Sequence, residues 1–396
     1  RLRQRSAHEI GHTLGFAHNF TSSAKNRTSV MDYPHPNIEM KGDQISIANA
    51  YEVGIGDWDK VTVAYAYSDF PEGTDEKEAL NAVIDQSAAA GHRFISDSDA
   101  RPIGGAHPNA HLWDNGGVAT DELARLMKIR KQALGQLSLD HLREGEPYST
   151  LEDRFVPMYL LHRYQVEAVV KLIGGVDYDY AVKGSQNYQV QVVDATTQRN
   201  ALLGYLNALA PDALAIPKPL HPLLPPRSFS NPRTRENFLS QTGVAFDYLG
   251  IAHSLSDALI GMLLHPDRAN RLVTQYGFDA NQLSLKEMLD TLVDSHFKVK
   301  PRDRHQAQLN DLVKSTILKH LMYLGQQPDA NPIVKALVVK QLVTLDRWLA
   351  GQEEEGFSEV YRMQIDRYFE APADFQPPTP KRLPDGSPIG SYSCDF

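Results

Sequence analysis

The sequence has little cysteine, no long apolar run and no excess of positive charge. Cys394 is the only cysteine among 396 residues, so no internal disulfide can form. Exported proteins need not use disulfides, so this absence leaves the compartment open. No apolar run approaches the roughly 20 residues that cross a bilayer, and we expect no membrane span. The formal net charge is −9, whereas nucleic-acid binders carry basic patches, so we expect no nucleic acid partner.

The overall composition is typical of a globular protein, with 42% hydrophobic and 22% charged residues. A chain of this length can form two or three domains with substantial cores. From about residue 119 onward, apolar residues recur at helical spacing, which predicts a mainly α protein. Such stripes include Leu160, Leu161, Tyr164 and Ala168, and later Leu309, Val313, Ile317, Leu321 and Leu324.

One stretch near the start has the residues of a metal site. Read as a helix over residues 5–15, it places His8 and His12 on one face, about one turn apart. Two imidazole nitrogens at this spacing can bind zinc at about 2.0–2.1 Å each. Glu9 lies beside the metal rather than on it, where its carboxylate can polarise a water molecule bound to the metal.

Gly15 ends this helix and allows a third histidine to return to the metal. Glycine adopts positive φ at little steric cost, so the chain can turn back and present His18 as the third ligand. Three protein ligands leave a fourth position for water, as in catalytic zinc sites. The alternative is a core helix whose histidines only form hydrogen bonds. All five fixed positions of the H-E-x-x-H-x-x-G-x-x-H pattern are present, which favours the zinc site.

With this pattern the sequence resembles the metzincin zinc endopeptidases. Met31, thirteen residues after His18, stands where those enzymes have the methionine of the Met-turn. The resemblance implies that its thioether lies beneath the three imidazoles. Tyr33 matches a tyrosine that the astacin-like and serralysin-like branches use as an extra zinc ligand or as a donor to the tetrahedral intermediate. The alternative for Tyr33 is simple packing in the turn.

Asn19, directly after the third histidine, differs from the Asp, Glu, Ser or Pro of the well-known metzincin branches. The sequence is more similar to large exported bacterial zinc-dependent metalloproteases whose C-terminal part is a Met-zincin domain of unknown function. The similarity extends through residues 51–59 and 161–165. It implies a secreted, periplasmic or cell-surface protein.

In metzincins, a twisted sheet precedes the zinc helix, and its edge strand binds extended substrate. The present sequence begins with Arg1, almost at the zinc helix, so the resemblance implies the C-terminal part of a longer protein. We therefore expect an upstream region of the same protein as a partner, contacting Ile10 and Leu14. Without it, residues 1–396 should be a poor protease.

The resemblance and the helical stripes together suggest two parts. Residues 1–118 should be a metzincin catalytic subdomain, with an irregular loop over 19–43 and helices over 44–54, 57–67 and 75–90, the second capped by Asp57. Residues 119–396 should be a helical C-terminal domain. Within it, the alternation over 189–192 predicts a short strand.

Proline interrupts the helical part twice. Seven prolines between Pro211 and Pro232 predict a stiff, extended crossing. The proline-rich tail from residue 371 should likewise be extended.

The turn-rich segment of residues 96–117 contains His107, His111 and Asp114. A segment this long without regular structure is often functional. The two histidines could be a second metal pair, although Pro108 disfavours a helix between them. The segment could also be a wall of the substrate cleft or a plain connector.

These features predict a zinc endopeptidase that binds Zn²⁺ through His8, His12 and His18 and acts on a protein or peptide substrate. Glu9 would be the general base, and Tyr33 would help to stabilise the oxyanion. The alternative is a non-catalytic zinc-containing binding or assembly protein with a helical docking domain. The intact Glu9 favours the enzyme.

Overall fold

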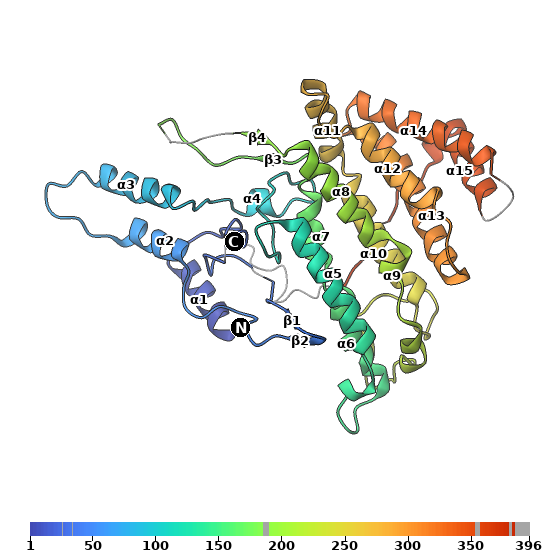
Figure 1. Ribbon diagram of the computed structural model, residues 1–396, viewed down its shortest axis with the longest axis horizontal. Coiled ribbons are helices and arrows are strands. Elements are labelled where there is room, and N and C mark those ends of the chain that lie inside the picture. Colours follow the sequence, from blue (N-terminus) through green and yellow to red (C-terminus); the bar gives the residue numbers. More distant parts are fainter. Residues whose placement is uncertain (26, 34, 185–189, 353–356, 380–381, 385–396) are drawn as a thin grey trace.

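The protein is described by a computed structural model that covers residues 1–396 except 26, 34, 185–189, 353–356, 380–381 and 385–396 (Figure 1). Cys394 and the first residue of the predicted strand, Gln189, lie outside the described residues.

The described chain is mainly α-helical, as predicted, and its strands form two short antiparallel hairpins. The elements of the N-terminal part are α1 (Leu2–Thr13), β1 (Glu39–Lys41), β2 (Gln44–Ser46), α2 (Asp57–Tyr67), α3 (Glu76–Ala89) and α4 (Asp97–Ala100). The following elements are α5 (Ala119–Gln136), η1 (Leu139–His141), η2 (Tyr148–Leu151), α6 (Glu152–Tyr159), α7 (Arg163–Val170), β3 (Val176–Asp177), β4 (Gln191–Val192), α8 (Ala195–Leu209), α9 (Pro211–Leu214) and η3 (Lys218–Leu223). The last are α10 (Tyr248–Leu263), α11 (Pro266–Phe278), α12 (Leu285–Phe297), α13 (Arg304–Gln326), α14 (Pro332–Ala350), α15 (Ser358–Glu370) and η4 (Pro372–Asp374).

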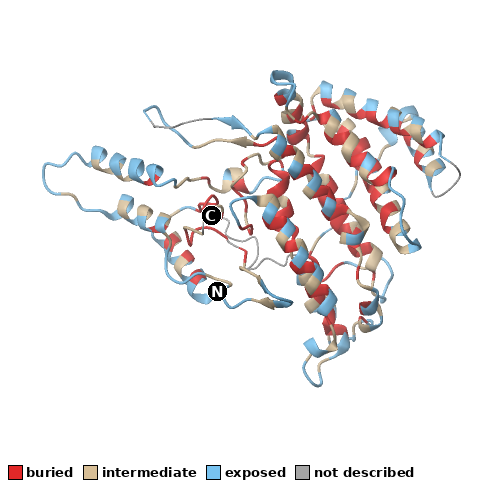
Figure 2. Ribbon diagram, in the orientation of Figure 1, coloured by how far each residue is buried: buried red, intermediate tan, exposed pale blue. Residues whose placement is uncertain are grey.

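From α5 onward, the helices pack against one another in succession (Figure 1): α5 on α7, α7 on α8 and α10, α10 on α13, α13 on α14 and α14 on α15. Most of these helices bury one face and expose the opposite one (Figure 2), whereas α7 and α10 have no exposed residue. This pattern follows from the apolar spacing, because a helix with one apolar face must bury it against another element. No described helix is both long enough and apolar enough to cross a membrane.

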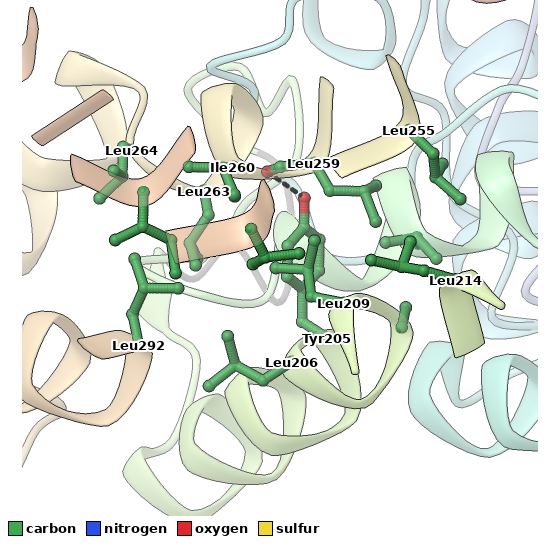
Figure 3. Packing of buried hydrophobic residues seen from close by; sticks show 14 of the residues in the cluster. Tyr205, Leu206, Leu209, Leu214, Leu255, Leu259, Ile260, Leu263, Leu264 and Leu292 are labelled. Atoms are coloured by element: carbon green, nitrogen blue, oxygen red, sulfur yellow. Dashed lines mark hydrogen bonds between the residues drawn. The ribbon is translucent and has the colours of Figure 1, made fainter. Parts of the chain in front are cut away.

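The main core extends through the helices from α5 to α15, and Figure 3 shows a part of it with residues of α8, α10 and α12. Leu206 and Leu209 of α8 lie near Leu259 of α10 and Leu292 of α12, and all four are buried. Tyr205 is fully buried among them, and its hydroxyl donates to the Leu259 carbonyl at 2.7 Å. A buried polar group needs such a partner, so this bond allows a tyrosine in an otherwise apolar layer.

The N-terminal part is less regular and has its own small core. Helices α2 and α3 pack together and project away from the helical part (Figure 1). A second hydrophobic cluster joins the loops between α1 and α5. It consists of Phe20, Tyr33, Ile95, Ala100, Ala110, Trp113 and Tyr164, the last of which belongs to α7.

Two expectations for the N-terminal part were wrong. Residues 44–54 do not form a helix, because Gln44–Ser46 pairs with Glu39–Lys41 through a two-residue turn in which Gly42 has φ of +62°. Glycine at the first central position favours such a hairpin. Helix α2 spans 57–67 as predicted, but Asp57 does not cap it; Asp59 accepts the N–H of Gly56 at 2.7 Å instead.

The proline-rich crossing is not extended throughout. Pro211 is the first residue of α9, where a missing N–H costs nothing, and Lys218–Leu223 forms the 3₁₀ helix η3. The tail likewise begins with a 3₁₀ turn at Pro372–Asp374 before it becomes irregular.

Candidate zinc centre

Helix α1 carries the first two histidines and ends as the sequence predicted. Gly15 has φ of +85°, and its N–H donates to the His12 carbonyl at 2.9 Å. The N–H of Phe16 donates to the Gly11 carbonyl at 3.0 Å. These two bonds form a Schellman motif, which reverses the chain after a left-handed glycine. The reversal returns His18 to the helix.

The three predicted histidines lie together, with their Nε2 atoms facing one another. His12 Nε2 is 3.1 Å from His8 Nε2 and 3.1 Å from His18 Nε2. Within the described part of the chain, they form the cluster of His, Cys, Asp or Glu side chains that could bind a metal ion. His8 and His12 therefore lie on one face of α1, as their spacing predicted.

The opposite nitrogen of each ring faces an oxygen that can only accept a hydrogen bond. The pairs are His8 Nδ1 with the Val30 carbonyl at 2.7 Å, His12 Nδ1 with the Phe16 carbonyl at 3.0 Å, and His18 Nδ1 with Asp97 Oδ2 at 2.8 Å. Each Nδ1 must therefore carry the proton. A neutral ring of this tautomer has a lone pair on Nε2.

Three Nε2 lone pairs thus converge on one point, which is unfavourable unless a cation lies between them. Nitrogens bound to one zinc ion at 2.0–2.1 Å in tetrahedral geometry lie about 3.3 Å apart, close to the 3.1 Å separations here. Burial lowers the pKa of His8 to about 4, so this ring is neutral at pH 7 and its lone pair is available. The donor set fits Zn²⁺.

Met31 lies against α1 at Gly11, and its role in a Met-turn stays a prediction. Its side chain is almost fully buried, and a Cβ built on Gly11 would lie only 2.2 Å from its Sδ. Gly11 therefore lets the thioether approach the backbone of α1 between the two helical histidines. The Met31 carbonyl accepts a hydrogen bond from the N–H of Asn19 at 3.1 Å, which links Met31 to the residue after His18.

This contact predicts that Gly11→Ala destabilises the protein. The added methyl group would overlap Met31, and overpacking of this kind costs about 1–3 kcal/mol in free energy of unfolding. Gly135→Ala is the matched control, because Gly135 also lies in a helix and a Cβ added there would have nothing within 4 Å. That change should raise stability by up to about 1 kcal/mol. Denaturant unfolding compares the two, and equal stabilities would contradict the predicted contact.

Asp59 fixes the segment that precedes Met31, a role that no motif in the sequence indicates. Its carboxylate accepts hydrogen bonds from Ser29 Oγ at 2.5 Å and from the N–H of Val30 at 2.8 Å, in addition to the one from the N–H of Gly56. Val30 in turn supplies the carbonyl that orients His8. The buried carboxylate therefore connects α2 to His8, the first candidate ligand.

Tyr33 packs against the candidate ligands. Its ring centroid lies 4.8 Å from that of His8 and 4.8 Å from that of His18. On its other side it contacts Trp113 at 4.8 Å, and the Trp113 N–H donates to the Tyr33 carbonyl at 2.7 Å. Trp113 has φ of +61°, an uncommon conformation for a non-glycine residue. The packing of Tyr33 is thus clear from the structure, whereas its catalytic role stays a prediction.

Glu9 is on the accessible side of α1. Its side chain is about half exposed, and its Oε1 is 3.7 Å from Nε of Arg5, one turn earlier. It is not a member of the histidine cluster. This position agrees with a residue that acts beside the metal rather than as a ligand.

Asp97, the partner of His18, was not predicted. It lies 79 residues after His18 in the four-residue helix α4. Burial opposes its ionisation, but hydrogen bonds from His18 and Arg101 outweigh this effect and lower the pKa of the carboxyl. No local pattern relates positions so far apart, so only the fold reveals the contact.

Residues 1–303 match the protein family described as Met-zincin. The chain belongs to this family. No curated protein and no solved structure matches the chain. The family implies a zinc metallopeptidase-like fold, and the histidine cluster of this Met-zincin could bind the metal.

The remaining candidates of this Met-zincin do not join the cluster. His107 Nε2 is 3.0 Å from the Tyr178 carbonyl, and His111 Nε2 is 3.3 Å from Glu167 Oε2. Neither histidine belongs to a potential metal cluster among the described residues, which disfavours a second metal pair.

Asp114 instead supports the loop that contains Ser23. Its carboxylate accepts a hydrogen bond from Ser23 Oγ at 3.0 Å, and the N–H of Ser23 donates to the carboxylate of Asp32 at 2.7 Å. Burial raises the pKa of Asp114 to about 7. Burial and the nearby Asp114 also raise the pKa of Asp32. The two carboxyl groups therefore resist being ionised together in this Met-zincin.

Proposed function

We propose that this Met-zincin is a zinc-dependent endopeptidase that hydrolyses peptide bonds in protein or peptide substrates. The observation that carries the proposal is the convergence of three Nε2 lone pairs from His8, His12 and His18. The Nδ1 protons of these histidines already have acceptors. A metal ion is therefore the partner that best satisfies the three Nε2 lone pairs. The family match supports the same class of enzyme.

Zinc, when bound, supplies a Lewis acid that polarises a water molecule and the scissile carbonyl. Glu9 takes a proton from the attacking water and passes it to the leaving amine. The Glu9 carboxylate is half exposed, so water can reach it while α1 stays folded. His8 and His18 are buried, whereas His12 and Glu9 are more accessible, so substrate approaches from the side of α1 that bears Glu9.

Two further roles belong to the same proposal. Met31 is the apolar floor beneath the ligands, and Tyr33 donates a hydrogen bond to the developing oxyanion. The family also suggests that the protein acts in a secreted, periplasmic or cell-surface location. Fractionation of the producing cells tests this location.

The direct test is cleavage of casein or a peptide library by the complete protein. We expect hydrolysis that a zinc chelator abolishes and that added zinc restores, together with one zinc per chain in the purified protein. Stoichiometric zinc without any cleavage would favour a non-catalytic binding protein. Cleavage that persists after complete removal of metal would contradict the proposed mechanism.

The role of Tyr33 predicts a separate kinetic effect. Tyr33→Phe keeps the ring that packs on His8 and His18 but removes the hydroxyl. Loss of one oxyanion donor lowers kcat by about 10²–10³-fold, and KM should change little because the contact forms only in the transition state. Steady-state kinetics on a peptide substrate measures both constants. An unchanged kcat would assign Tyr33 to packing.

A further inference from the structure

The three candidate ligands differ in what orients them. The Nδ1 atoms of His8 and His12 face backbone carbonyl groups, which no side-chain substitution removes. The Nδ1 atom of His18 faces a side-chain carboxylate, Asp97 Oδ2, at 2.8 Å. His18 is also the ligand that lies outside α1, so the helix does not fix its ring.

The Asp97 carboxylate is itself held at both oxygens. Arg101, one turn later, donates to Oδ1. Oδ2 accepts His18 Nδ1 and, at 3.2 Å, Ser96 Oγ. A carboxylate with both oxygens engaged has little freedom to rotate away, so it presents a fixed acceptor to the imidazole.

Helix α4, which carries Asp97, is anchored to the helical part of the protein. The buried Lys171, just after α7, donates to the Ala100 carbonyl at the end of α4 and to the Ala110 carbonyl at 2.7 Å. The hydroxyls of Tyr178 and Tyr180 also donate hydrogen bonds to Asp99 of α4. The position of Asp97 therefore depends on segments far from the zinc helix.

We propose that Asp97, fixed by Arg101, is a positioning residue that orients His18 for zinc. It keeps the proton of His18 on Nδ1 and fixes the plane of the ring. Partners of this kind typically contribute 10–100-fold to metal affinity. The inference rests on the proposed zinc site and adds a residue that acts through His18 without touching the metal.

Two substitutions separate the hydrogen bond from the charge. Asp97→Ala removes both, and we expect zinc affinity to fall by about 10–100-fold. Asp97→Asn retains an oxygen that can accept from Nδ1 but removes the charge, so its affinity should lie between those of Asp97→Ala and the unmodified protein. Competition with a chromophoric zinc chelator measures these affinities. The absorption spectrum of the cobalt(II)-substituted protein should also change, because His18 is one of the ligands.

The matched control is Asp99→Asn. Asp99 lies on the same short helix and is hydrogen-bonded, but its partners are Tyr178 and Tyr180 rather than His18. This variant should perturb α4 locally and leave zinc affinity within about 2-fold of the unmodified value, well below the effect expected for loss of an oriented ligand partner. Equal losses in Asp99→Asn and Asp97→Ala would reassign Asp97 to general support of the loop.

A measurement without metal distinguishes this inference from the proposed function. In the metal-free protein, nitrogen-15 NMR of labelled histidine should show His18 protonated at Nδ1, and Asp97→Ala should redistribute the proton between the two nitrogens. If the unmodified protein bound no zinc, the proposed function would fail, whereas this result would still test the contact. Normal zinc binding, an unchanged cobalt spectrum and an unchanged His18 tautomer in a folded Asp97→Ala protein would overturn the inference.

Discussion

Replacing Glu9 with glutamine should reduce peptide hydrolysis by about 10²–10⁴-fold, the usual contribution of a general base, while zinc stays bound. The amide has nearly the same size as the carboxylate but cannot take a proton from water. Glu9 is not among the clustered histidines, and its side chain is about half exposed, so the change should not disturb ligand geometry or folding. Turnover of a fluorogenic peptide and the zinc content of the same preparation measure the two effects.

The matched control for Glu9→Gln is Arg5→Gln. Both variants remove the exposed pair between Arg5 and Glu9, and pairs of this kind contribute only about 0–1 kcal/mol to stability. Arg5→Gln leaves the carboxylate in place, so its activity should stay within a few-fold of the unmodified protein. Substantial cleavage by Glu9→Gln would remove Glu9 from the mechanism. Loss of zinc in that variant would instead identify an unexpected structural role.

The core of the candidate site could be predicted because its determinants are local. His8 and His12 share a face through the geometry of one helix, and Gly15 ends that helix within the same dozen residues. The Schellman motif then reverses the chain, which brings His18 back beside His12. The helical part was predictable for a related reason, since a repeated apolar spacing selects one buried face per helix.

The parts that could not be predicted depend on contacts between distant segments. Asp97 reaches His18 across 79 residues, and Asp59 reaches Ser29 across 30. Neither contact leaves a periodic trace in the sequence. The sequence also contained no sign that Gly11 is important. The need for glycine there follows only from the position of Met31, whose Sδ would overlap a Cβ at Gly11.

The boundary between a catalytic part and a helical part stays a prediction. Tyr164 of α7 belongs to the same small cluster as Tyr33 and Trp113, and Lys171 binds the backbone of two loops near the site. Segments on both sides of residue 119 therefore support the candidate zinc centre. A division drawn from motifs alone separates residues that pack together.

Replacing His12 with alanine should abolish stoichiometric zinc binding. His12 Nε2 is 3.1 Å from the Nε2 atoms of the other two candidate ligands, His8 and His18, so its loss leaves only two of the three nitrogens. We expect affinity to fall by more than about 100-fold, since even residues that only orient a ligand contribute 10–100-fold. Zinc analysis after dialysis against a weak chelator measures this loss.

Thermal unfolding provides a second readout for His12→Ala. A ligand present at 1,000 times its Kd stabilises the folded state by about 4 kcal/mol, so added zinc should raise the Tm of the unmodified protein and not that of the variant. His141→Ala is the control, because His141 is an exposed histidine in η1 and should leave the zinc response intact. Stoichiometric zinc in His12→Ala would show that the converging lone pairs do not form the metal site. An equal loss in His141→Ala would show that the measured zinc binds elsewhere.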